Sequence, residues 1–253
     1  MEPPVLEVRS LSKSFGGLKV TNDVSFRIRR GELSSIIGPN GAGKTTLFNL
    51  VTGKLAPDSG EVRFKGERID GLSTAEIARK GIGRAFQITS IFKERSVLEN
   101  VLVAVLSRKR MTGRLFRRAA SYSDAVEEAM ESLERLSLSG KARQRAGSLP
   151  HGDQKRLDIA VALSLHPEVV MLDEPMAGMS PEERATTVEL LKKIWREKAL
   201  TLLFIEHDMD VVFGISGWIR VLNQGVLIAE GTPEEISRNR EVITAYLGEE
   251  IVE

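Results

Sequence analysis

The residues best suited to chemistry form a glycine-rich loop, Gly38-Pro39-Asn40-Gly41-Ala42-Gly43-Lys44-Thr45. It fits the pattern G-x-x-x-x-G-K-[ST], in which glycines let backbone N–H groups converge on phosphate oxygens. Lys44 places a compact positive charge on the terminal phosphates, and the Thr45 hydroxyl suits Mg²⁺. The sequence therefore predicts a nucleoside triphosphate site, with Thr46 as the next residue in contact with the phosphates.

The flanking segments agree with this interpretation. An apolar run, Leu33–Ile37, precedes the loop as a buried strand would. A helical pattern, Thr45–Thr52, follows it and directs its positive N-terminal end at the phosphates. This strand–loop–helix context argues against a chance glycine loop.

A second apolar strand, Val169–Leu172, ends in two carboxylates, Asp173 and Glu174. Ligands gather at the carboxyl ends of strands in open α/β sheets. Asp173 suits a Mg²⁺ ion, bound directly or through water, and Glu174 suits a general base that polarises water. The alternative is a solvated acidic pair, which the phosphate-binding loop makes less attractive.

Three further residues are candidates for the nucleotide site, although each alone is a less specific signal than the loop. His207 follows the buried strand Leu203–Ile205 and could orient water at the γ-phosphate, although a single histidine is more often structural. Gln87 ends the segment Ile82–Phe86, and an isolated glutamine is usually a surface residue. Phe15 could stack on a nucleobase, but an isolated phenylalanine is usually core.

The composition of the chain limits which folds, partners and locations are possible. The chain has 253 residues, a formal net charge of +1 and no cysteine. The length suits one domain with an inserted lobe, and the near-neutral charge does not favour nucleic acid as a partner. The absence of cysteine excludes disulfides and thiol chemistry, and suits a reducing cytosol. We expect no signal peptide, and the longest apolar runs are far below the roughly 20 residues of a spanning helix.

Alternating elements predict the fold. Strand patterns (Leu6–Leu11, Val24–Arg30, Gly60–Gly66) dominate the start, and helical periodicity covers about Val97–Leu136. Helices at Asp153–Leu165 and Pro181–Glu197 then alternate with buried strands at Val169–Leu172 and Leu200–Ile205, and a hairpin turns at Asn223-Gln224-Gly225. We expect an α/β fold: a P-loop core with an N-terminal antiparallel β-subdomain (1–86 and 166–253) and an inserted helical subdomain (87–165).

The order of these motifs resembles the ATP-binding subunit of ABC transporters over essentially the whole chain. The resemblance makes Phe15 the aromatic of the A-loop, Gln87 the Q-loop glutamine and a metal contact, and Asp173 the Walker B aspartate. It makes Glu174 the catalytic glutamate and His207 the switch histidine. It implies ATP and Mg²⁺ as ligands, hydrolysis of ATP, and two subunits that sandwich two nucleotides.

Several phrases are similar to the branched-chain amino acid importers in particular: Phe15-Gly16-Gly17-Leu18, Ser96–Val101, Ile205–Met209 and Ala245-Tyr246-Leu247-Gly248. The resemblance implies permease subunits, a solute-binding protein, and a peripheral location on the cytoplasmic face of the membrane. Importers of urea and other amides share much of this pattern. A soluble ABC ATPase that acts as a mechanical switch on ribosomes or DNA, and a nucleotide-binding regulator that does not turn over, are competing functions.

One segment departs from the family. The signature Leu-Ser-Gly-Gly-Gln, which contacts the γ-phosphate held by the opposite subunit, falls here on Leu149-Pro150-His151-Gly152-Asp153. Pro150 supplies neither a hydroxyl nor an N–H. Asp153 could cap the following helix but is unfavourable near phosphate unless it points away or is shielded. His151 either donates to phosphate or is an exposed loop residue.

A basic stretch, Arg108–Arg118, gathers six positive charges in eleven residues. Such runs are usually solvated, here as a hinge in the helical subdomain. The other interpretation places the stretch near anionic lipid headgroups, where each charge contributes about 1 kcal/mol.

Pro150→Ser tests the signature segment. Restoring a hydroxyl and an N–H should strengthen the closed ATP-bound dimer, because a hydrogen bond to a charged phosphate contributes roughly 1.5–3 kcal/mol. Sedimentation with ATP and a phosphate-release assay would measure this. Unchanged dimer affinity together with an unchanged ATPase rate would refute it.

Overall fold

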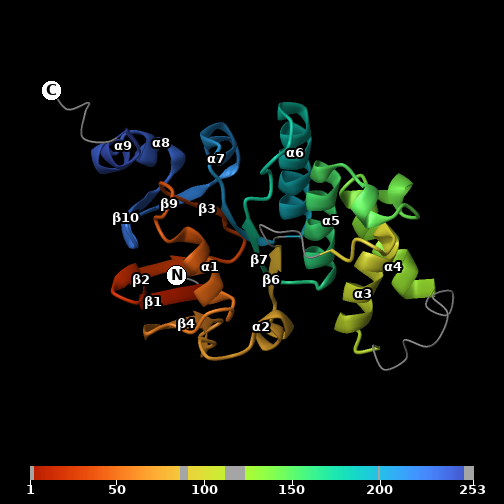
Figure 1. The fold of residues 1–253 in the computed structure, drawn as a ribbon, viewed down its shortest axis with the longest axis horizontal. Helices are drawn as coiled ribbons and strands as arrows, with labels where there is room; N and C mark the ends of the chain where they lie inside the picture. Colours follow the sequence, from red (N-terminus) through yellow and green to blue (C-terminus); the bar gives the residue numbers. More distant parts are fainter. Residues whose placement is uncertain (1–2, 86–90, 112–122, 199, 248–253) are drawn as a thin grey trace. The chain divides into compact units, whose positions relative to one another are not determined.

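A computed structural model describes residues 3–85, 91–111, 123–198 and 200–247 (Figure 1). The chain divides into two compact units, which we call the first unit (Met1–Lys80 and Ala199–Glu253) and the second unit (Gly81–Lys198). The helical subdomain expected at 87–165 lies within the second unit, and its boundaries stay a prediction.

The first unit contains an antiparallel sheet with the strand order β2-β1-β4-β5. Its strands are β1 (Leu6–Phe15), β2 (Leu18–Ile28), β4 (Ser59–Phe64) and β5 (Glu67–Arg68). Apolar side chains at alternate positions, such as Leu6 and Val8 of β1, are buried and supply the core face. The predicted strands on either side of Gly16-Gly17 are confirmed: β1 continues to Phe15, and β2 begins earlier than expected, at Leu18, and ends at Ile28 instead of Arg30.

Four further strands of the first unit pair in the order β10-β9-β3-β8. They are β3 (Leu33–Ile37), β8 (Thr201–Ile205), β9 (Trp218–Asn223) and β10 (Val226–Gly231). β3 runs parallel to both β8 and β9, and every residue of β3 and β8 is buried. The predicted hairpin is confirmed, because β9 and β10 pair antiparallel across Gln224-Gly225.

Five helices of the first unit are described. They are α1 (Lys44–Val51), α2 (Thr74–Lys80), α7 (Met209–Ile215), α8 (Pro233–Ser237) and α9 (Arg240–Leu247). Both α8 and α9 pack beside β10 (Figure 1). Helix α8 begins at a capping box in which Thr232 and Glu235 bond to each other's backbone N–H, with Pro233 in the first turn.

The second unit combines a parallel strand pair with helices. The strands are β6 (Ile82–Ala85) and β7 (Val169–Asp173). The helices are α3 (Val97–Arg108), α4 (Ser123–Arg135), α5 (His151–Ser164) and α6 (Pro181–Lys198), with short 3₁₀ turns η3 (Ser139–Lys141) and η4 (Ala146–Ser148). Helices α3, α4 and α5 pack on one another, and α5 also packs on β6 and β7 (Figure 1). In the described residues of the region predicted as helical, Val97–Leu136, α3 ends at Arg108 and α4 begins at Ser123.

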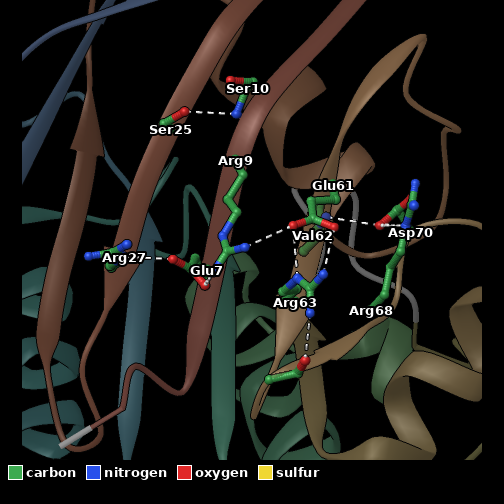
Figure 2. Close-up of polar contacts among 11 residues, drawn as sticks. Glu7, Arg9, Ser10, Ser25, Arg27, Glu61, Val62, Arg63, Arg68 and Asp70 are labelled. Carbon is green, nitrogen blue, oxygen red and sulfur yellow. Dashed lines mark hydrogen bonds and ion pairs between the residues drawn. The ribbon is translucent and has the colours of Figure 1, made fainter.

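A chain of ion pairs crosses the antiparallel sheet of the first unit. Figure 2 shows Glu7 of β1 between Arg9 and Arg27, at 2.6 and 2.7 Å, while Arg9 also reaches Glu61 of β4 at 3.1 Å. The Glu61 carboxylate accepts a further bond from Arg63 at 2.8 Å. Hydrogen bonds from these arginines hold the pKa values of Glu7 and Glu61 below their usual range. Charged side chains thereby join three adjacent strands.

Glu7→Gln should destabilise the protein by roughly 1 kcal/mol at pH 7, because Glu7 is buried and loses its charge-assisted bonds to two arginines. A folded-state pKa below the unfolded value gives stability that is present above the unfolded pKa and is lost as pH falls. The difference between wild type and variant should therefore shrink as pH is lowered toward 4, as measured by urea unfolding.

Glu67→Gln is the matched control, because Glu67 pairs only with Lys80 among the described contacts and its side chain is 70% exposed. Glu67→Gln should lower the free energy of unfolding by less than Glu7→Gln does. Equal losses for the two variants would contradict the stabilising role given to the ion pairs of Glu7.

Candidate nucleotide-binding site

The predicted phosphate-binding loop of the first unit lies between β3 and α1, as the sequence indicated. Gly43 is the N-cap residue of α1 and has a left-handed backbone, with φ +96°. A Cβ there would lie 2.3 Å from the carbonyl oxygen of Val20, and one at Gly38 would lie 2.0 Å from that of Leu222. Glycine is required at both positions because neighbouring backbone occupies the space of a side chain.

The hairpin and β2 hold the outer side of this loop by backbone hydrogen bonds. The N–H of Gly225 donates to the carbonyl of Ala42 at 3.1 Å, and the carbonyl of Gly225 accepts from Asn22 at 2.8 Å. These bonds connect the loop to β2 through the turn between β9 and β10. The loop is therefore fixed to the hairpin and to β2, and within the loop the N–H of Ala42 donates to the carbonyl of Pro39 at 3.2 Å.

Lys44 begins α1 and is buried, with 6% of its surface exposed. Its ammonium donates to the carbonyls of Gly38 and Pro39, at 2.7 and 2.9 Å. The charge therefore lies within the curve of the loop, where phosphate oxygens would compete with these carbonyls. The next residue, Thr45, is exposed, and Thr46 is half-buried.

Helix α9 reaches the same loop. The backbone of Gly38 forms a hydrogen bond with the Tyr246 hydroxyl, which lowers the pKa of that group, yet burial dominates and raises it to about 12. A cavity of about 830 Å³ lies between α9 and the loop residues Pro39 to Ala42, and Arg240 and Thr244 also line it. The sequence analysis did not identify this contact, since Tyr246 lies far from the loop along the chain.

Two other predicted residues belong to the first unit. His207 lies two residues after the end of β8 and is exposed, and its backbone N–H donates to Glu206 Oε2 at 3.3 Å. Phe15 ends β1 with 46% of its surface exposed, and the Lys13 ammonium lies 5.8 Å from its ring centre. An exposed ring can stack on a base, whereas a core phenylalanine cannot.

The predicted carboxylates belong to the second unit, at the end of β7. Asp173 is 2% exposed, and its Oδ2 accepts a bond from Arg84 Nη2 at 3.1 Å. Burial raises the pKa of Asp173, while Arg84 acts in the opposite direction. Glu174 has φ +50°, a left-handed conformation that costs about 1–2 kcal/mol outside glycine. The backbone at Glu174 is therefore strained, as it often is at functional sites.

The Asp173 carboxylate fits a hydrated Mg²⁺ ion. Among the residues that the structure describes, none forms a hydrogen bond with its buried Oδ1 atom. A buried carboxylate oxygen without a partner is costly, and a metal-bound water would satisfy it. The described part of the chain holds no cluster of three or more His, Cys, Asp or Glu residues that could bind a metal without the nucleotide.

The signature segment begins α5, and here one expectation is wrong. Pro150 is the N-cap residue, no side chain caps the helix, and Asp153 lies buried in its first turn. Asp153 does not cap α5, because its carboxylate pairs with Lys141 and Arg156 instead. These two cations provide the shielding that an acid near phosphate would need. His151 is exposed, and its Nδ1 lies 3.1 Å from the position of a Cβ on Gly178.

Gln87 lies outside the described residues, as does most of the basic stretch. Of that stretch, Arg108, Lys109 and Arg110 are described among the basic residues: Arg108 and Lys109 pair with Glu128 of α4, and Arg110 is exposed. Within the first unit the structure brings together Lys44, the rest of the loop and Tyr246. Within the second it brings Asp173 to Arg84, a residue that the sequence analysis missed although its charge in a short strand was a signal.

Comparison with known families shows the family to which this chain belongs. The profile of the family described as ABC transporter matches residues 21–177, more than half of the chain. The chain belongs to the ABC transporter family. A second profile, described as Branched-chain amino acid ATP-binding cassette transporter, matches residues 226–252.

Two relatives within the ABC transporter family match the sequence of this chain over nearly its full length. The high-affinity branched-chain amino acid transport ATP-binding protein LivG of Salmonella typhimurium is 45% identical over 256 residues, covering 98% of this chain and 100% of LivG. BraF of Pseudomonas aeruginosa, described in the same words, is also 45% identical, with coverage of 98% and 100%.

Solved structures of ABC cassettes share the fold. MJ1267, an ATP-binding cassette of an ABC transporter, matches with a TM-score of 0.86 at 31% identity, covering 98% of this chain and 100% of that one. A dimeric structure of the cassette MJ0796 bound to ADP and Pi matches with a TM-score of 0.78 at 26% identity, covering 90% and 98%. The predicted α/β P-loop fold is thereby confirmed. No helix in the described residues has the length and apolarity to cross a membrane.

Gly38→Ala tests the packing of the phosphate-binding loop in this ABC cassette. The added Cβ would collide with the Leu222 carbonyl, so the loop or β9 must shift. We expect a loss of stability of at least about 2 kcal/mol and strongly weakened binding of a fluorescent ATP analogue. Urea unfolding and fluorescence titration would measure these changes.

Gly66→Ala is the control, because Gly66 has φ +82° but open space around its Cβ. The Gly66→Ala variant should lose only about 1 kcal/mol in its free energy of unfolding, and it should bind the ATP analogue as the wild type does. Similar losses of nucleotide affinity in both variants would rule out the packing explanation.

Proposed function

We propose that this chain binds and hydrolyses MgATP as the ATP-binding subunit of an importer for branched-chain amino acids. The observation that carries the proposal is the 45% identity with LivG over 98% of this chain and all of LivG. The match of residues 226–252 to the branched-chain family profile supports the choice of solute.

In this proposal the phosphate-binding loop holds the triphosphate. Backbone N–H groups of the loop bind phosphate oxygens, and the Lys44 ammonium binds the terminal phosphates. Thr45, Gln87 and Asp173 hold Mg²⁺, and Phe15 stacks on the base. Bound Mg²⁺ supplies positive charge that offsets the charge developing on the phosphoryl oxygens.

The proposed hydrolysis is an in-line attack of water on the γ-phosphorus. Glu174 positions that water and accepts its proton, while His207 donates a hydrogen bond to the γ-phosphate. As the water oxygen forms a bond to phosphorus, the bond to the β–γ bridging oxygen breaks, and ADP and inorganic phosphate leave. Lys44 stabilises the charge on the leaving side.

We further propose that two cassettes form the working assembly, each closing its signature segment, Leu149 to Asp153, over the other's nucleotide. The dimeric MJ0796 cassette supports a dimer for this fold. Permease subunits would dock near Gln87 and hold the cassettes at the cytoplasmic face of the membrane, and a solute-binding protein would deliver the solute.

The solute is tested by co-expressing the chain with its neighbouring permease and solute-binding subunits and reconstituting the complex in liposomes. ATP hydrolysis should rise when the solute-binding protein carries leucine, isoleucine or valine. Stimulation by urea or short amides instead would assign the chain to an amide importer. Hydrolysis that responds to no solute and to no permease would refute the transport function.

Glu174→Gln tests the catalytic role. The amide cannot accept a proton, so ATP hydrolysis should fall at least about 100-fold while ATP binding persists. The variant should accumulate as an ATP-bound dimer in gel filtration, because reopening follows hydrolysis. Glu182→Gln is the control, since Glu182 lies exposed in the first turn of α6. Full turnover by the Glu174 variant would exclude this residue as the base.

A further inference from the structure

Arg84 is a buried charge to which the proposed mechanism gives no role. It lies on β6, and only 6% of its side chain is exposed. Burial lowers the pKa of its guanidinium, so the surroundings penalise the charge, and Asp173 offsets part of this penalty. A buried arginine is retained at such a cost only with a partner that satisfies it.

The pairing of β6 with β7 explains why these two side chains meet. Arg84 lies opposite Met171 in the parallel register. Because side chains alternate between the two faces of a strand, Asp173, two residues after Met171, shares a face with Arg84. The long arginine side chain covers that distance and places Nη2 3.1 Å from Asp173 Oδ2.

The two carboxylate oxygens of Asp173 therefore have different environments. Oδ2 accepts the bond from Arg84, and Oδ1 is buried without a hydrogen-bond partner in the described part of the chain. A bond to one oxygen restricts rotation of the carboxylate about its Cβ–Cγ bond. The bond from Arg84 therefore limits the directions in which Oδ1 can point.

We infer that Arg84 is a positioning residue, which holds Asp173 by Oδ2 so that Oδ1 is presented to the Mg²⁺ ion bound with ATP. The inference rests on the proposed function, which makes Asp173 a metal contact. Groups that orient a metal ligand typically change metal affinity 10- to 100-fold when they are removed. The role needs the planar guanidinium, which a lysine ammonium replaces only in charge.

The test is a titration of the full chain with Mn²⁺ at saturating ATP, followed by electron paramagnetic resonance of the free ion. Arg84→Met should raise the apparent Mn²⁺ dissociation constant about tenfold, with Arg84→Lys in between. Combining Arg84→Met with Asp173→Asn should be no worse than Asp173→Asn alone, because Arg84 acts through that carboxylate. Binding of a fluorescent ATP analogue in EDTA should stay unchanged, since it reports the loop of the first unit.

Arg108→Met is the matched control, as it also removes a paired arginine from the second unit, here the partner of Glu128. It should leave the Mn²⁺ titration unchanged.

If Arg84→Met does not fold, Arg84→Lys carries the test, and wild-type Mn²⁺ affinity in a folded Arg84→Lys overturns the inference. Unchanged or tighter Mn²⁺ binding by Arg84→Met overturns it as well. If the wild type shows no ATP-dependent Mn²⁺ binding at all, the proposed function fails, and the inference fails with it.

Discussion

The phosphate-binding loop depends on two backbone carbonyls that occupy the space a side chain would need. The carbonyls of Val20 and Leu222 come from strands on either side of the loop and lie against Gly43 and Gly38. Since backbone cannot move as a side chain can, the loop has one way to pack. Its curvature is therefore set by the surrounding strands, and α1 begins with Lys44 already inside the curve.

The elements that provide these carbonyls are far apart in the sequence. β2 precedes the loop, and the β9–β10 hairpin follows it by well over a hundred residues. Tyr246 of α9, within the segment that matches the branched-chain family profile, adds a hydrogen bond at Gly38. Through this hydrogen bond, helix α9 near the C-terminus contacts the first residue of the phosphate-binding loop.

Local patterns explain what could be predicted from the sequence. The glycine-rich loop, the strand ending in Asp173-Glu174 and the hairpin at Gln224-Gly225 are each encoded by neighbouring residues, and all were placed correctly. Arg84 was not recognised, because its partner lies 89 positions away and the contact depends on strand register. The strain at Glu174 was also invisible, since a glutamate, unlike a glycine, gives no sign in the sequence of a positive φ.

Asp153 shows how the partners of a side chain alter the interpretation of a motif. Judged from its residue type alone, Asp153 would repel a phosphate and weaken the binding of that phosphate to the signature segment. In the structure Lys141 and Arg156 both pair with it, so the local charge is compensated, and the carboxylate helps to fix the first turn of α5. A compensated buried acid repels an anion far less than a solitary one. The other departure from the family's signature is Pro150, which supplies neither a hydroxyl nor an N–H at the start of α5.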